Sequence, residues 1–412
     1  MSELGRLLSA PTQEGVRLLE WRAGELVPAQ PGSRPAERSG AYLLSRAPSV
    51  PDLRENLRAA LEAGLPLVVL PPSSAREEDV LLRQLPATPP ASARLVMFTS
   101  GTTGEPKAVF HAESSLLASA RQLARALKGS GPSVSLLPAW GMAGVIFHCI
   151  LPAVRGGSAV FSREPALDWG PFVPALLRTL EADFITLNPA LLEMLLLTGL
   201  DPQWRGSVVS LTAPLKPALR ARITGHKLLE IFGMTEASGP VLLEGKSLGA
   251  ETRLAADAEL ELKGPQFLLG YAADGHFTPA PEWFGTGDIF SLENGRLAHQ
   301  ARKRDLIDLG GRKISPRVIE EVLEAMPEIA ECLAFAVELS GVERPGLLFV
   351  RKSGCNLPHD ALSSRLEQLM GAGLSPELRP KWWREVPALP RLKNGKPDRK
   401  AARLKWLVEN RA

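Results

Sequence analysis

Short apolar runs alternate with helical periods through the middle of the chain. Four of these runs predict buried strands because both of their faces are apolar: LPLVVL (65–70), ARLVMF (93–98), DFITL (183–187) and SVVSL (207–211). Residues 113–128 place Leu116, Ala120, Leu123 and Leu127 on one face, which predicts an amphipathic helix. This alternation predicts an α/β fold with parallel or mixed sheets covered by helices.

The two ends of the chain differ from this middle. Residues 1–50 show no sustained period, so we expect irregular structure there. Residues 253–297 alternate with turn signals and predict a β-rich subdomain, and a helix entered through Pro316 opens an α+β region. We therefore predict a large N-terminal domain at 1–299, a hinge at 300–304 and a small α+β C-terminal domain at 305–412.

Composition narrows the function classes. The chain has 412 residues, of which 45% are hydrophobic and 23% charged, with a formal net charge of +3. So small a charge gives no reason to expect nucleic acid or an anionic membrane as the partner. The three widely spaced cysteines argue against a zinc site and for a reducing compartment. With no signal peptide and no apolar run near the roughly 20 residues of a membrane span, we expect a cytoplasmic protein.

A polar loop follows the predicted strand at 93–98. The segment FTSGTTGEPK (98–107) contains hydroxyl side chains, glycines and a terminal lysine. Glycine admits a close ligand, and exposed backbone N–H groups bind phosphate oxygens. The spacing is not that of a Walker A loop, and a flexible polar turn is the alternative. The candidate phosphate-binding residues are Thr99, Ser100, Gly101, Thr102, Thr103, Gly104 and Lys107.

Five motifs in this order resemble those of the adenylate-forming superfamily, which contains acyl- and aryl-CoA synthetases. They are FTSGTTGEPKAV (98–109), IFGMTEASG (231–239), WFGTGDIF (283–290), ARKRDLIDLGGRKISPRVIEEVL (301–323) and LPRLKNGKPDRK (389–400). The resemblance implies that ATP and Mg²⁺ convert a carboxylic acid to an acyl-adenylate and that the acyl group then passes to the thiol of CoA. It also implies that the C-terminal domain is mobile and swings after adenylation.

The resemblance implies roles for individual residues. Lys396 would bridge the acyl oxygen and the α-phosphate, Glu236 would hold Mg²⁺, and Thr235 would donate to a phosphate. The other nucleotide or CoA contacts would be Phe232 and Gly233 at adenine, Asp288 at the ribose, Arg302 at the ribose or phosphates, and Gly310 and Gly311 along the pantetheine. For each residue a structural role is the alternative: a solvated Lys396, a helix-capping Thr235–Glu236 pair, a packed Phe232, a turn-forming Asp288.

The acid pocket is predicted around Trp140, Gly141, Thr212, Ala213, Met234 and Ala237. Gly141 stands where the family often has a gating histidine, and His148 is expected to be a buried helix residue rather than its substitute. No Asp lies at 138–144 to hold an ammonium group, which disfavours an amino-acid substrate. The short region before the loop resembles compact o-succinylbenzoate–CoA ligases of menaquinone synthesis. Trp140 and the small residues beside it lead us to expect an aryl or branched acid.

Two further readings stay open. A stand-alone adenylating enzyme could load the phosphopantetheine arm of a carrier protein, and the basic segment RPKWWR (379–384) could bind that carrier or the phosphates of CoA. A non-catalytic nucleotide-binding homologue is the other alternative. The sequence does not determine the acid, the acceptor or the oligomeric state.

Overall fold

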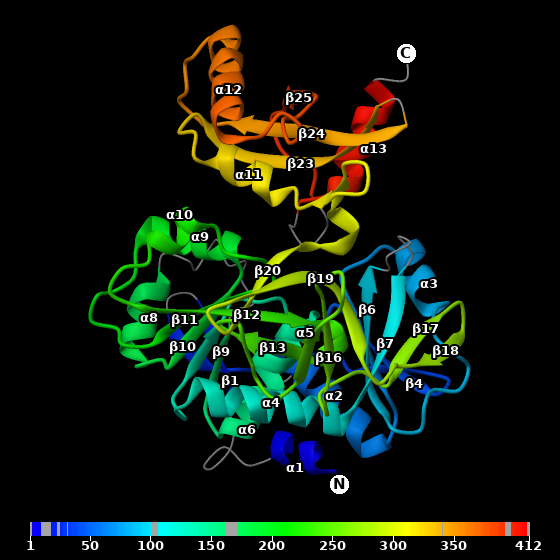
Figure 1. Ribbon diagram of the computed structural model, residues 1–412. Coiled ribbons are helices and arrows are strands. Elements are labelled where there is room, and N and C mark those ends of the chain that lie inside the picture. The colour runs from blue at the N-terminus through cyan, green and yellow to red at the C-terminus, as the bar shows by residue number, and fades with distance from the viewer. Residues whose placement is uncertain are drawn as a thin grey trace. The chain divides into compact units, whose positions relative to one another are not determined.

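The computed structural model (Figure 1) describes residues 2–9, 18–22, 25–30, 32–100, 106–161, 172–339, 341–391 and 397–409. The chain divides into two compact units. The first unit contains residues 1–252 and 262–284, and the second unit contains residues 253–261 and 285–412. The second unit thus begins before the predicted hinge at 300–304, and the hinge itself stays a prediction.

A nine-stranded sheet forms one part of the first unit. It is parallel from β12 to β1 and antiparallel at its two ends. The strand order is β14 (Lys246–Ser247), β13 (Gly239–Leu243), β12 (Lys227–Met234), β11 (Ser207–Leu211), β10 (Phe184–Leu187), β8 (Ser133–Ser135), β9 (Ala159–Phe161), β1 (Leu18–Arg22) and β2 (Glu25–Pro28).

A mixed seven-stranded sheet forms the other part of the first unit. The strand order is β18 (His276–Pro279), β17 (Gly270–Ala273), β7 (Pro106–Ala112), β6 (Ala93–Ser100), β5 (Leu67–Leu70), β4 (Tyr42–Arg46) and β3 (Glu37–Ser39). The neighbouring pairs β4–β5 and β5–β6 are parallel, and the other neighbouring pairs of this sheet are antiparallel.

Helices cover both sheets. Successive residues of a strand lie on opposite faces of its sheet, and both faces are apolar here, so both must be covered. Leu67 and Val69 enter a core that also holds Val209 and Leu211 of the other sheet, whereas Val68 and Leu70 enter a second core with β7. The helices of this unit are α1 (Glu3–Ser9), α2 (Val50–Ala63), α3 (Ala75–Leu82), α4 (Glu113–Leu127), α5 (Met142–Gly144), the π-helix η1 (Val145–Ile150), α6 (Leu151–Arg155), α8 (Val173–Thr179), α9 (Pro189–Thr198), α10 (Pro217–Ala221) and the 3₁₀ turn η3 (Thr235–Ala237).

Sheets and helices of the second unit form an α+β arrangement. A four-stranded sheet has the order β15 (Glu251–Leu254), β16 (Glu259–Lys263), β19 (Phe284–Glu293) and β20 (Arg296–Arg302). The chain continues through η4 (Lys303–Asp305) and a hairpin of β21 (Ile307–Asp308) and β22 (Lys313–Ile314). Strands β23 (Ile329–Leu339), β24 (Val342–Arg351) and β25 (Trp382–Glu385) form a sheet that packs against α11 (Arg317–Glu324) and α12 (His359–Gly373) on one face and α13 (Arg399–Glu409) on the other.

The predicted fold class is confirmed, but one local expectation is wrong and one strand was not predicted. Residues 1–50 are not irregular throughout, because α1 and β1–β4 form there. Residues 106–112 form β7, which the sequence analysis did not predict as a strand. These strands are held by partners remote in sequence, for example Leu18 beside Ala159 and Tyr271 beside Val109. No helix in the described part of the chain is long and apolar enough to cross a membrane.

Candidate active site

The predicted phosphate loop connects two antiparallel strands. Thr99 at the end of β6 pairs with Lys107 at the start of β7, and both side chains are half-buried. Gly101, Thr102, Thr103 and Gly104 lie outside the described residues, as does the side chain of Ser100. The Nζ atom of Lys107 lies 5.6 Å from the centroid of the Tyr271 ring. The strand pair therefore fixes Lys107 beside the mouth of the loop.

The Thr235–Glu236 pair lies in η3, directly after β12. A β-bulge at Phe232 and Gly233 precedes this turn. A Cβ atom at Gly233 would lie 2.6 Å from the carbonyl oxygen of Gly239, so this position requires glycine. The hydroxyl of Tyr271 donates to Oε1 of Glu236 at 3.1 Å. The turn therefore brings Glu236 to Tyr271 on β17, the strand that pairs with β7.

A buried polar pair, which carried no signal in the sequence, joins the end of η3 to β7. Nδ1 of His111 on β7 lies 3.0 Å from Oγ of Ser238, the residue that ends η3. Both residues are fully buried. Burial lowers the pKa of His111 to about 3, so the ring is neutral at pH 7. This pair holds the end of η3 against β7.

Residues of the predicted acid pocket lie at the carboxyl ends of β11 and β12 and before α5. Strands β11 and β12 are parallel with Leu211 opposite Ile231, so Thr212 and Phe232 follow at the same edge of the sheet. Thr212 is exposed and has φ = 78°, a left-handed value that costs about 1–3 kcal/mol for a residue other than glycine. Ala213 follows it and is half-buried.

The rest of the pocket is apolar. Trp140 packs at the edge of the main core, Ala237 is fully buried, and Met234 packs beside Phe267 and Tyr271. A Cβ atom at Gly141 would meet only a backbone oxygen 3.8 Å away, so the position has room for a side chain.

The expectation that His148 is a buried helix residue is confirmed. It lies in η1 with 1% of its surface exposed, and its Nε2 is 2.8 Å from the carbonyl oxygen of Leu137. Burial lowers the pKa of His148 to about 4. The His148 side chain is therefore part of the interior of the first unit.

Asp288 lies on β19 of the second unit in a carboxylate site that is almost closed to solvent. Its side chain is 2% exposed, and Oδ1 lies 3.1 Å from Nε2 of His299 and 3.2 Å from Nε of Arg302. The Oδ2 atom is buried without a hydrogen-bond partner among the described residues. A buried acceptor of this kind suits a hydroxyl donor, as a ribose would supply. Within this group, His299 carried no recognisable signal in the sequence.

The predicted CoA and lysine segments also lie in the second unit. Gly310 (φ 72°) and Gly311 (φ 95°) form the left-handed turn between β21 and β22, where a Cβ atom at either position would meet no atom within 4 Å. Lys396 lies outside the described residues. The chain on either side of it is anchored, since Arg391 and Pro397 form a β-bridge.

Arg399 ties this segment to the rest of the second unit. Its Nη2 donates to Oε1 of Glu320 at 2.6 Å and its Nε to the carbonyl oxygen of Ala334 at 3.0 Å. Its Nη1 also lies 3.6 Å from Oδ2 of Asp305, next to the predicted hinge residue Arg304. The residues on either side of Lys396 are therefore held in place by contacts within the second unit.

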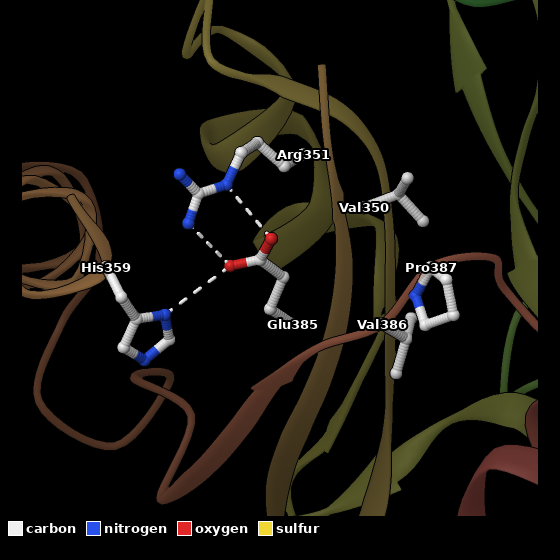
Figure 2. Close-up of a pocket in the computed structure, with 6 residues that line it drawn as sticks. All are labelled: Val350, Arg351, His359, Glu385, Val386 and Pro387. Atoms are coloured by element: carbon white, nitrogen blue, oxygen red, sulfur yellow. Dashed lines mark hydrogen bonds and ion pairs between the residues drawn. The ribbon is translucent and has the colours of Figure 1, made fainter. Parts of the chain in front are cut away.

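A pocket of about 420 Å³ lies elsewhere in the second unit and holds none of the predicted site residues. Figure 2 shows that Arg351 pairs with both oxygens of Glu385, at 2.9 and 2.8 Å, and that His359 faces the same carboxylate. These charges neutralise one another, which favours a structural role. The nearby Trp382 and Trp383 pack on Phe335 and Phe349, so the tryptophans of RPKWWR belong to the two cores of this unit.

The sequence profile of the AMP-binding enzyme family matches residues 37–266, more than half of the chain. The chain belongs to the AMP-binding enzyme family. This confirms the resemblance on which the predicted site depends, although the role of each site residue stays a prediction.

Curated members of the AMP-binding enzyme family resemble this chain over part of their length. The sulfoacetate–CoA ligase of Cupriavidus necator is 27% identical over 337 residues, covering 70% of this chain and 64% of the relative. The 2-succinylbenzoate–CoA ligase of Listeria monocytogenes is 31% identical over 269 residues, covering 58% and 56%. This chain thus spans about three fifths of the length of these relatives.

A solved structure shows the same fold along nearly the whole chain. It is the o-succinylbenzoate CoA synthetase of Bacillus subtilis in complex with the acyl-adenylate intermediate OSB-AMP, with a TM-score of 0.77 and 18% identity. The match covers 98% of each chain. The chain therefore shares its fold with that enzyme.

Family membership implies Mg²⁺, and the donor set fits it. Mg²⁺ in phosphate-transfer sites is held by one or two carboxylates together with substrate phosphates and waters. Glu236 supplies one carboxylate beside Lys107, and the described residues hold no cluster of three or more His, Cys, Asp or Glu side chains that would form a cage made only of protein. Such a donor set suits a metal that arrives with a nucleotide.

Proposed function

We propose that this protein uses ATP to convert a carboxylic acid to an acyl-adenylate and then transfers the acyl group to the thiol of CoA. The observation that carries the proposal is that Lys107 and Glu236 both contact Tyr271, in a member of the AMP-binding enzyme family. The CoA ligases among the curated relatives support the second half of the reaction.

The first step brings two anions together. A carboxylate oxygen attacks the α-phosphorus, the bond between the α-phosphorus and the bridging oxygen breaks, and pyrophosphate leaves with that electron pair. Positive charge aimed at the transition state lowers this barrier. Lys107 faces the departing phosphates, and Lys396 bridges the acyl oxygen and the α-phosphate. Bound Mg²⁺ would neutralise phosphate charge at Glu236.

The second step transfers the acyl group. The thiol sulfur of CoA attacks the acyl carbon, its proton passes to solvent or a base, and AMP leaves with the electrons of the broken acyl–oxygen bond. Asp288 and Arg302 bind the ribose and the phosphates of the nucleotide. The left-handed turn at Gly310 and Gly311 presents backbone without side chains, which leaves room for the narrow pantetheine arm.

The acid that we propose is an aryl acid of the 2-succinylbenzoate type, which places the protein in menaquinone synthesis. The Listeria monocytogenes relative and the Bacillus subtilis structure, both named for that acid, support this choice. Trp140 and the apolar Met234 and Ala237 favour an acid that contains an aromatic ring. We further propose a cytoplasmic location, with which the three free cysteines agree.

Acid-dependent exchange of labelled pyrophosphate into ATP tests the first step. We expect exchange with 2-succinylbenzoate or another aryl acid, and loss of exchange in Glu236→Gln, with the same thermal unfolding temperature as the parent. Adding CoA or a carrier protein with its phosphopantetheine arm then identifies the acceptor from the thioester formed. Absence of exchange with every acid would instead favour a non-catalytic nucleotide-binding protein, and stronger exchange with long-chain fatty acids would refute the aryl-acid assignment.

A further inference from the structure

Tyr271 stands between the two parts of the predicted phosphate site. It lies on β17, which pairs antiparallel with β7, and it is directly opposite Val109. Alternate residues of a strand share a face, so Lys107, Val109 and His111 lie on one face of β7. Side chains directly opposite across two strands also share a face, and diagonal neighbours lie within reach of an aromatic ring. The strand pairing thus places Tyr271 beside Lys107.

Two separate parts of Tyr271 make two separate contacts. Its hydroxyl donates to Oε1 of Glu236 at 3.1 Å, and its ring lies under the ammonium of Lys107, with 5.6 Å between Nζ and the ring centroid. Its ring also packs against Phe284, with 6.4 Å between the centroids. Burial, and then the charge of Glu236, raise the pKa of Tyr271, so the phenol keeps its proton and stays a donor.

We propose that Tyr271 is a positioning residue that orients Glu236 through its hydroxyl and Lys107 through its ring for binding of the metal and the phosphates of ATP. This inference rests on the proposed function. A hydrogen bond to a carboxylate restricts its rotation, and this orientation favours metal binding. A cation held over a ring keeps its position at lower entropic cost than a free lysine.

The two contacts can be removed one at a time. Tyr271→Phe deletes the hydroxyl and keeps the ring, whereas Tyr271→Leu deletes both. Because a hydrogen bond to a charged group is strong, we expect Tyr271→Phe to raise the Mg²⁺ concentration at half-maximal exchange by about ten- to a hundredfold. We expect its affinity for ATP without metal to change less than threefold, since Lys107 keeps its ring. Tyr271→Leu should raise the Mg²⁺ concentration at half-maximal exchange and also lower the affinity for ATP without metal.

The chain offers a matched control in Tyr42, its only other tyrosine. Tyr42 is buried, and its hydroxyl donates at 2.7 Å to the carbonyl oxygen of Pro86, which is not a predicted site residue. Tyr42→Phe should lower thermal stability without changing the Mg²⁺ dependence. If Tyr271 has only a structural role, Tyr271→Phe should also lower thermal stability and leave the Mg²⁺ dependence unchanged. If Tyr271 is a positioning residue, Tyr271→Phe should change the Mg²⁺ dependence, whereas Tyr42→Phe should not.

A second measurement does not depend on activity. Binding of Mn²⁺ in the presence of ATP, followed by electron paramagnetic resonance, should weaken in Tyr271→Phe by the same factor as the Mg²⁺ dependence. If the parent protein binds Mn²⁺ and ATP in this way but shows no exchange with any acid, the proposed function fails while the role of Tyr271 stands. If exchange occurs and Tyr271→Phe matches the parent in both measurements, the role of Tyr271 is refuted alone. A parent protein that binds no ATP with metal refutes both.

Discussion

Acidification should destabilise the first unit through two buried histidines. His111 and His148 both lie in its interior, and burial holds their pKa values at about 3 and about 4, below the ordinary value of 6.5. A group with a depressed pKa in the folded state binds fewer protons there than in the unfolded chain. Stability is therefore lost as pH falls below 6.5, until each histidine titrates in the folded state.

The size of this loss follows from the shifts. One pKa unit corresponds to about 1.36 kcal/mol, and pH 5 lies about 1.5 units below the unfolded value, so each histidine should cost about 2 kcal/mol between pH 7.5 and pH 5. Together the two residues should lower the free energy of unfolding by about 4 kcal/mol. That is a large fraction of the roughly 5–15 kcal/mol available to a folded protein.

Urea unfolding at pH 7.5, 6.5, 5.5 and 5.0 measures the loss. His111→Gln and His148→Gln should each remove about half of it, whereas His276→Gln should leave it unchanged, because His276 is exposed. The comparison of slopes with pH is unaffected by any constant destabilisation that a variant introduces. Equal slopes in the parent and in the variant that lacks both buried histidines would refute the reasoning.

Three further predictions concern single sites. Asp288→Asn should raise the KM for ATP at least tenfold, because charge-assisted hydrogen bonds are worth about 1.5–3 kcal/mol each, while the KM for the 2′,3′-dideoxy nucleotide stays unchanged. Gly141→Ala should leave the urea midpoint unchanged, whereas Gly144→Ala, whose Cβ would lie 2.1 Å from a backbone oxygen, should cost about 1–3 kcal/mol. Arg399→Gln should cost about 1–3 kcal/mol at pH 7, as measured by urea unfolding. Because burial raises the pKa of Glu320, that cost should shrink as pH falls and the carboxyl is protonated.

Much of the first unit could be predicted from local pattern. Strands β5, β10 and β11 are buried on both faces, so their sequences are apolar without interruption. Helix α4 carries its apolar period for 15 residues. Strand β7 carried no such signal, since Lys107 and His111 interrupt it, and pairing with β6 and β17 holds it in place.

Some residues of the candidate site could be predicted from the sequence, and others could not. Motif order pointed to Thr235, Glu236 and Asp288, because those residues lie in recognisable segments. Tyr271 and His111 carried no local signal. Tyr271 reaches Glu236 across 35 residues and His111 reaches Ser238 across 127 residues, so only the folded chain brings each pair together.

The second unit is discontinuous, since it takes residues 253–261 from one place in the chain and 285–412 from another. A fragment that starts at 285 would lack β16, the strand that pairs with β19 in the order β15-β16-β19-β20. Its bare strand edge would be a template for aggregation. Expression of the second unit by itself must therefore include residues 253–261, by fusion or by circular permutation.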